Sequence, residues 1–138
     1  MAFVVDASVA ATWMLPDEHN DAAERLIADL QSAPGLVPSL FWFEARNLFL
    51  MAERRGRVAA GEAVATMQRL RRLPLQDAGS GSDTAVLELA ITHNRTPYDA
   101  SYLALALDRK LPLATCDKRL AEAARREAIE LVGPLAGS

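Results

Sequence analysis

The sequence contains a single cysteine and no long run of apolar residues. One cysteine, Cys116, excludes an internal disulfide and is typical of a protein that works in the reducing cytoplasm. No apolar run reaches the roughly 18 residues that a membrane-spanning helix needs. No basic segment precedes the apolar start of the chain, so we expect neither a signal peptide nor a membrane partner.

Histidine is also scarce. His19 and His93 are isolated from each other and from Cys116, so we assign none of the three a metal-binding or nucleophilic role. What the chain does have is apolar material, since 51% of its 138 residues are hydrophobic. This share argues against disorder, and the length suits one domain, which we place at residues 1–138. The net charge of −3 disfavours nucleic-acid binding by bulk electrostatic attraction.

Short apolar runs alternate with amphipathic patterns along the chain, which predicts an α/β fold with a mainly parallel sheet covered by helices. Strands are expected at residues 3–6, 36–38, 74–76, 111–115 and 129–132. Helices are expected at residues 7–15, 17–30, 39–55, 60–73, 83–94, 97–108 and 118–127. Residues 79–82 are expected to form a loop and residues 133–138 a tail. In the helix at 83–94, we expect Val86, Leu87, Ala90 and Ile91 to face inward.

Four acids occupy comparable places in this pattern. Asp6 and Asp117 each end a strand, Asp99 opens a helix after Thr96, and Glu44 lies within the most apolar helix of the chain. Each has an ordinary explanation. The three aspartates could cap helices, and the glutamate could form a buried ion pair with an arginine. One shared cause explains all four more simply than four separate coincidences.

Carboxylates gathered at one place repel one another unless cations join them. A set of oxygen ligands without histidine or cysteine suits Mg²⁺ or Mn²⁺ better than zinc. Such an ion can activate water and stabilise charge on a phosphoryl group, so the expected chemistry is phosphodiester hydrolysis. Without the four acids the rest of the chain is slightly basic. Arginines near residues 54–57, 69–72 and 125–126 could contact phosphates, or simply compensate helix C-termini.

Two other classes of acid-dependent protein fit less well. A phosphatase with an aspartyl nucleophile needs a second acid two residues after the first, and Ser8 stands there. A receiver domain of the response-regulator kind needs an early acidic pair and a late lysine after a strand, and that set is missing.

Four stretches of this chain resemble, in order, the motifs of the PIN-domain superfamily, and within it the VapC-type ribonuclease toxins. They are residues 4–8, 43–47, 98–106 and 113–120. The resemblance implies a three-layer α/β/α sandwich and Mg²⁺-dependent cleavage of RNA, either tRNA or rRNA, with Mn²⁺ as an alternative ion.

Particular residues take roles from this resemblance. Asp6, Glu44, Asp99 and Asp117 fall on the acidic positions of the family, and Ser8 and Thr115 fall near hydroxyl positions that support those carboxylates. The resemblance implies that Asp6 and Asp99 bind the metal most directly, and that Glu44 completes the cluster or orients water. Asp117 then holds a second ion or an ordered water.

The resemblance also implies a homodimer and a cognate VapB-type antitoxin whose tail covers the active site. Four aromatic residues are candidates for that groove or the dimer contact, although apolar aromatics more often lie in the core. They are Trp13, Phe41, Trp42 and Phe49. A solitary PIN nuclease without antitoxin and a catalytically silent PIN-like binding module stay as alternatives. The presence of all four acids counts against the silent module.

Overall fold

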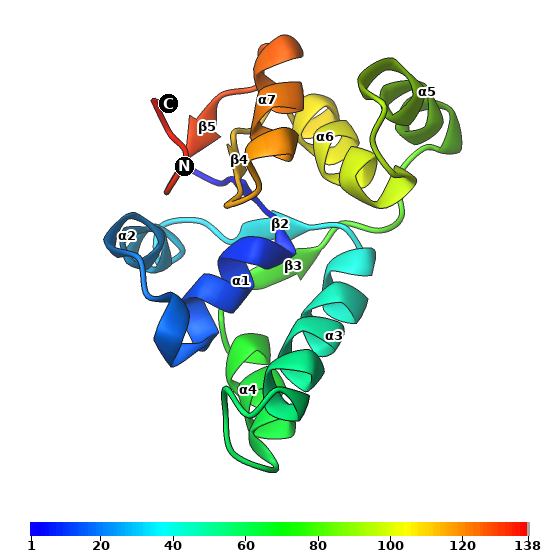
Figure 1. Cartoon of the computed structure of the whole chain (residues 1–138). Helices are drawn as coiled ribbons and strands as arrows, with labels where there is room; N and C mark the ends of the chain where they lie inside the picture. Colours follow the sequence, from blue (N-terminus) through cyan, green and yellow to red (C-terminus); the bar gives the residue numbers. More distant parts are fainter. Residues whose placement is uncertain (138) are drawn as a thin grey trace.

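Five short parallel strands form the centre of the computed structural model, which describes residues 1–137 (Figure 1). Ser138, the end of the expected tail, lies outside the described residues. The strands stand in the order β3-β2-β1-β4-β5, and all neighbours pair in parallel. They are β1 (Val4–Val5), β2 (Gly35–Val37), β3 (Leu75–Asp77), β4 (Leu113–Ala114) and β5 (Leu131–Val132). The predicted parallel sheet is therefore confirmed, with β1, β4 and β5 shorter than expected and β2 and β3 each displaced by one residue.

Helices cover both faces of this sheet. Figure 1 shows α1 to α4 on one side of it and α5 to α7 on the other, so the predicted three-layer α/β/α arrangement is confirmed. The helices are α1 (Ala7–Met14), α2 (Asp21–Asp29), α3 (Leu40–Arg54), α4 (Glu62–Arg71), α5 (Asp83–His93), α6 (Pro97–Arg109) and α7 (Lys118–Arg126). None of the helices within residues 1–137 is both long and apolar enough to cross a membrane.

The chain reverses its direction across the sheet at β1. From β1 it proceeds through β2 to β3 at one edge, and then returns across the sheet to β4 and β5. β1 and β4 are therefore neighbours with connections that leave in opposite directions, paired at Val4 with Leu113 and at Val5 with Ala114. In open parallel sheets, such a switch point leaves a crevice at the carboxyl ends of the strands.

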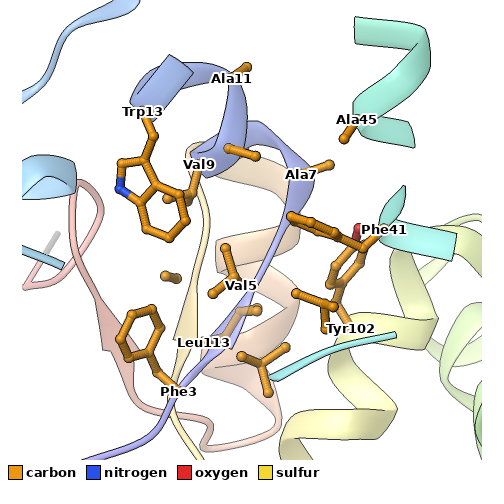
Figure 2. Close-up of a cluster of buried hydrophobic side chains, with 14 of the residues drawn as sticks. Phe3, Val5, Ala7, Val9, Ala11, Trp13, Phe41, Ala45, Tyr102 and Leu113 are labelled. Carbon is orange, nitrogen blue, oxygen red and sulfur yellow. The ribbon is translucent and has the colours of Figure 1, made fainter. Parts of the chain in front are cut away.

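The core packs around the central strand. Figure 2 shows apolar side chains gathered about Val5, which has no exposed surface. Trp13, Phe41, Trp42 and Phe49 all belong to this core. Their assignment to a groove or dimer contact is wrong, because each side chain is buried within the chain itself. Burial as core was the commoner expectation for such residues.

Two local predictions also fail. Residues 17 and 18 do not open the second helix, since they belong to η1 (Pro16–Glu18), a short 3-10 helix, and α2 begins after Asn20. Asn20 Oδ1 accepts a hydrogen bond from Ala23 N at 3.0 Å and so caps α2. In α5, Val86 and Ala90 are buried as expected, but Leu87 and Ile91 are exposed. The helix packs mainly on α6, which covers only a narrow stripe of its surface.

Candidate active site

Asp6 follows β1 directly, at the switch point of the sheet. Its backbone stands at the N-cap position of α1, but its side chain makes no capping hydrogen bond. Instead Oδ2 accepts hydrogen bonds from Ser8 Oγ at 2.6 Å and from Thr115 Oγ1 at 2.7 Å. The cap explanation for Asp6 is therefore wrong. The residue is only 8% exposed, and its carboxylate is turned toward Thr115 at the end of β4.

Two backbone donors fix the hydroxyls that hold Asp6. Cys116 N donates to Ser8 Oγ at 2.9 Å, and Asp117 N donates to Thr115 Oγ1 at 3.0 Å. Because each hydroxyl oxygen already accepts a proton from the backbone, its own proton is free to point to Asp6. Ser8 and Thr115 thus both donate hydrogen bonds to an acid of the predicted cluster, as the resemblance to the PIN superfamily implies.

Asp117 caps α7 and also faces the same crevice. Its Oδ1 accepts hydrogen bonds from Arg119 N at 2.9 Å and from Leu120 N at 3.3 Å. The cap explanation is correct for this residue. The other carboxylate oxygen, Oδ2, has no hydrogen-bond partner within residues 1–137. It can therefore accept a further contact while Oδ1 caps the helix.

Glu44 comes from the second turn of α3 and accepts a hydrogen bond from a tyrosine. The distance from Tyr102 Oη to Glu44 Oε1 is 2.5 Å, and no arginine pairs with Glu44 among the described residues. The buried ion-pair explanation is therefore wrong. Burial raises the pKa of Glu44, the tyrosine hydroxyl opposes that rise, and the nearby charges of Asp6 and Asp99 add to it.

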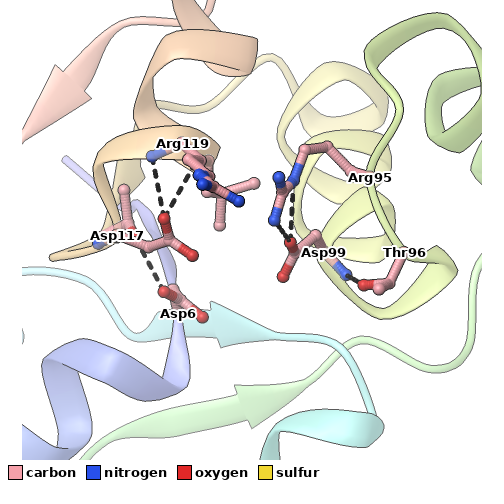
Figure 3. Close-up of polar contacts among 8 residues, drawn as sticks. Asp6, Arg95, Thr96, Asp99, Asp117 and Arg119 are labelled. Carbon is pink, nitrogen blue, oxygen red and sulfur yellow. Dashed lines mark hydrogen bonds and ion pairs between the residues drawn. The ribbon is translucent and has the colours of Figure 1, made fainter.

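Asp99 is held at the start of α6. Thr96 Oγ1 accepts a hydrogen bond from Asp99 N at 3.1 Å, which confirms Thr96 as the N-cap. The Asp99 carboxylate has a further partner, because Arg95 donates to Oδ2 from Nε at 3.1 Å and from Nη2 at 2.8 Å (Figure 3). Arg95 and Asp99 stand four residues apart, a spacing that allows such a pair on one side of a helix start.

All four acids line one pocket of about 570 Å³. They come from four parts of the chain, namely the residue after β1, α3, α6 and the turn after β4. The sequence therefore identified residues that the fold does bring together. Two exposed aromatic residues, Phe43 and Tyr98, also line this pocket and are 65% and 64% exposed.

Negative charges lie close to the buried Asp6 in this pocket. Burial raises the pKa of Asp6, the two hydroxyls oppose the rise, and the negative charges of Asp117 and Asp99 reinforce it. A divalent cation would remove this repulsion, and an all-carboxylate donor set fits Mg²⁺ or Mn²⁺. Within residues 1–137, no three potential ligand side chains stand close enough to share an ion as arranged. Mg²⁺ usually keeps several of its waters and takes only one or two carboxylates as direct ligands, so the other acids would act through those waters.

Sequence reasoning gave no role to three residues that matter here. Tyr102 holds Glu44, Arg95 holds Asp99, and Phe43 stands exposed at the pocket. Tyr102 lies three residues after Asp99, on the same side of the expected helix, and this spacing could have identified it. The sequence offered no comparable signal for the exposure of Phe43, one of several adjacent apolar residues.

Several of the proposed phosphate-contacting arginines have partners already. Arg57 pairs with Asp17 at 2.9 Å and also with Glu18. Arg71 stacks over the Trp42 ring, with its guanidinium carbon 3.9 Å from the ring centroid. Arg126 pairs with Glu122 at 2.7 Å. Charge compensation and packing therefore explain these three arginines.

An acidic pocket at the switch point of a parallel α/β/α sandwich defines the class of this protein. The PIN domain model matches residues 3–126, so the chain belongs to the PIN domain family. The chain is also 33% identical over 126 residues to Ribonuclease VapC3 from Pyrobaculum aerophilum. The aligned region covers 88% of this chain and 94% of that relative. The family predicted from the four motifs is confirmed.

Solved structures share the fold at lower identity. The crystal structure of PAE2754 from Pyrobaculum aerophilum has a TM-score of 0.72 and 24% identity, over 89% of this chain and 79% of that chain. Mycobacterium tuberculosis VapC20, described as a sarcin-ricin loop cleaving toxin, has a TM-score of 0.66 and 17% identity, over 96% and 99%. FitAcB from Neisseria gonorrhoeae has a TM-score of 0.66 and 16% identity, over 97% and 98%.

Proposed function

We propose that this protein is a metal-dependent endoribonuclease and the toxin of a VapBC-type toxin–antitoxin pair. The observation that carries the proposal is the pocket in which Asp6, Glu44, Asp99 and Asp117 meet. Membership of the PIN domain family and the similarity to Ribonuclease VapC3 support RNA as the substrate. The substrate class within RNA is tRNA or rRNA, and VapC20 provides a precedent for the latter.

The four acids divide the work in this proposal. Asp6 and Asp99 hold Mg²⁺ or Mn²⁺, and Glu44 completes the site or orients the attacking water. Asp117 binds a second ion or an ordered water through the carboxylate oxygen that does not cap α7. Bound Mg²⁺ would supply positive charge for the attacking water and the scissile phosphate. Ser8 and Thr115 hold Asp6 in place through their hydrogen bonds.

The exposed aromatics suit a single-stranded or unpaired RNA segment. Proteins that read unpaired RNA stack its bases on aromatic side chains. Phe43 and Tyr98 line the acidic pocket with most of their surface exposed. In this proposal they receive the bases on either side of the cleaved bond, while the acids receive the phosphate.

The remaining parts of the proposal follow from the VapC resemblance. The protein forms a homodimer, works in the cytoplasm where its RNA substrate is, and is silenced by a VapB-type antitoxin whose tail covers the pocket. A basic side chain from that tail would satisfy the same carboxylates that repel one another in the free protein. Residues 1–138 form one nuclease domain in this proposal.

The experiment is an RNA cleavage assay with purified protein and total RNA, in Mg²⁺, in Mn²⁺ and in EDTA. Asp6→Asn should abolish cleavage, because it removes a charge from the centre of the pocket. Asp29→Asn makes the same chemical change at an exposed position of α2 and should leave cleavage intact. Sequencing the RNA ends would then identify the bond that is cut.

Two results would contradict the proposal. One is cleavage that persists in EDTA, and the other is an Asp6→Asn protein that cuts as fast as the Asp29→Asn control. Cleavage by a chain without a neighbouring antitoxin reading frame would favour the solitary nuclease. A well-folded protein that binds RNA and never cuts it would favour the silent binding module.

A further inference from the structure

A second, basic pocket adjoins the acidic one. It has a volume of about 250 Å³ and lies between the turn from α5 to α6 and helix α7. Three arginines line it, namely Arg95, Arg119 and Arg126, against the single carboxylate of Glu122. Arg126 pairs with Glu122 at 2.7 Å and Arg95 pairs with Asp99 at 2.8 Å, so Arg119 supplies the uncompensated positive charge of the pocket.

Arg119 is a free cation at this pocket. Its backbone N–H donates a hydrogen bond to Asp117 Oδ1. Its guanidinium has no hydrogen bond or ion pair with any other residue of the described chain, 1–137. Figure 3 shows its side chain between Asp117 and Arg95, so it stands beside the acidic pocket without neutralising it. An exposed arginine whose five donors are all unused is suited to an external anion.

Arg95 belongs to both sites. It donates from Nε and Nη2 to a single oxygen of Asp99, which leaves both N–H groups of Nη1 unused. Its side chain is 21% exposed and lines the basic pocket. One guanidinium can therefore bind Asp99 on one edge and an anion on the other, which connects the two pockets through a single rigid group.

A buried histidine also lines this pocket. His93 lines it with only 4% of its side chain exposed, and its Nε2 lies 2.6 Å from Glu127 Oε2. This contact ties the end of α5 to the end of α7. The other ring nitrogen, Nδ1, has no hydrogen-bond partner among residues 1–137, although buried polar atoms are usually satisfied.

We propose that Arg95 and Arg119 form a subsite for a backbone phosphate of RNA that flanks the scissile bond. The proposal rests on the nuclease function above and adds the direction in which the substrate strand leaves the acidic pocket, across α7. Arginine binds phosphate with two parallel hydrogen bonds, and two guanidiniums at one pocket can hold one phosphate from two sides. This contact is independent of base sequence, because phosphates carry no sequence information.

The test measures RNA binding without cleavage. A short, fluorescently labelled single-stranded RNA is titrated with the full chain in EDTA, at several salt concentrations, and a gel confirms that the RNA stays intact. The variants are Arg119→Gln and Arg119→Lys, and the matched control is Arg25→Gln, which removes the same charge from the exposed surface of α2. Two unrelated RNA sequences are compared.

We expect Arg119→Gln to weaken binding about fivefold for both RNA sequences, since an exposed charged contact contributes about 1 kcal/mol. The slope of log affinity against log salt should become shallower by about 0.7, the value for one phosphate contact with a single strand. Arg119→Lys should restore most of the slope because it keeps the charge. Arg25→Gln should bind as the unchanged protein does.

A salt slope for Arg119→Gln equal to that of Arg25→Gln would overturn the subsite. So would a loss that depends on the RNA sequence, because it would indicate base recognition. If Arg119→Gln instead kept its affinity for RNA and lost affinity only for an acidic peptide such as polyglutamate, the proposal would be wrong, and the pocket would bind an acidic protein segment. The nuclease function is judged separately, by the Asp6→Asn cleavage assay, so either idea can fail while the other stands.

Discussion

At the scale of single residues, the acidic pocket places chemically equal carboxylates in unequal surroundings. Asp6 is buried and accepts hydrogen bonds from two hydroxyls, Glu44 accepts one from a buried tyrosine, and Asp99 forms an ion pair with an arginine. Asp6 is the buried one of the three, and its two hydroxyl partners fix its position without neutralising its charge. Its burial therefore destabilises the folded protein whenever the carboxylate is ionised.

Replacing Asp6 by asparagine should stabilise the protein at neutral pH. Because burial raises the pKa of Asp6, the folded state holds this proton more tightly than the unfolded state does. The resulting stability is present below the unfolded pKa and is lost as pH rises through the folded pKa. We expect Asp6→Asn to gain about 1 kcal/mol at neutral pH in urea unfolding, and to lose that advantage in acid. An equal gain in Asp29→Asn would contradict this account.

Removing the tyrosine hydroxyl should affect both stability and activity. Tyr102 is fully buried and donates its proton to Glu44, and a hydrogen bond to a charged group contributes about 1.5–3 kcal/mol. This hydrogen bond opposes the burial that raises the pKa of Glu44, so its loss in Tyr102→Phe should raise that pKa further. The acidic limb of the pH–rate profile should then move to higher pH. An unchanged profile at reduced activity would show that Glu44 does not titrate in catalysis.

At the scale of elements, α6 provides the rigid support for Asp99. Thr96 caps the helix, Pro97 occupies its first position, and Asp99 follows in the first turn. The proline suits this place, because its missing N–H would be unpaired there in any case. The helix then packs against β1 and β4, the two strands whose ends carry the other aspartates. Fixing the start of α6 therefore also fixes the distance of Asp99 from the switch point.

Two helix caps of the same kind allow a matched comparison. Thr96→Ala should cost about 1 kcal/mol of unfolding free energy and also reduce cleavage, because Asp99 loses the hydrogen bond that holds its backbone N–H. Ser82→Ala removes the equivalent cap of α5, where Ser82 Oγ accepts from Ala85 N at 3.3 Å. It should cost a similar amount of stability and leave cleavage unchanged. Equal activity losses in both variants would indicate a purely structural effect.

At the scale of the whole molecule, the sheet topology gathers residues that are far apart in the chain. The acids at positions 6, 44, 99 and 117 meet only because β1 and β4 are neighbours with connections that leave in opposite directions. The same arrangement places the basic subsite next to the acidic pocket, because α7 begins directly after Asp117. The molecule thus presents adjoining negative and positive surfaces around one crevice.

Magnesium should stabilise the fold as a whole. A ligand that binds only the folded state adds about 2.7 kcal/mol at a hundred times its dissociation constant. We expect the melting temperature to rise with Mg²⁺ concentration in the unchanged protein and to stay nearly constant in Asp6→Asn. Sodium chloride of equal ionic strength serves as the control for general screening. An equal rise in both proteins would place the bound ion outside the acidic pocket.

Much of this structure could be predicted from local patterns. The five strands and the helices were recognisable because periodicity and capping residues act over a few neighbours, as at Thr96 and Ser82. Predictions failed where a distant neighbour decided the outcome. Trp42 was a candidate for the groove or dimer contact, with the core as the commoner expectation, and it is buried with Arg71 of α4 over its ring. Ile91 has the spacing of a core residue, yet no element of residues 1–137 covers that side of α5.

The sequence by itself singled out the four acids that the fold places at one pocket, because a charged residue at a strand end or within an apolar helix stands out against its neighbours. It also determined the family, through four motifs in order. The cap at Asp117 and the pair of Arg95 with Asp99 join close neighbours in the chain. Only the tertiary structure decided that Thr115 holds Asp6 and that Tyr102 holds Glu44. Those contacts join residues up to 109 positions apart, as between Asp6 and Thr115. Such contacts depend on how the strands are ordered in the sheet, which no local pattern encodes.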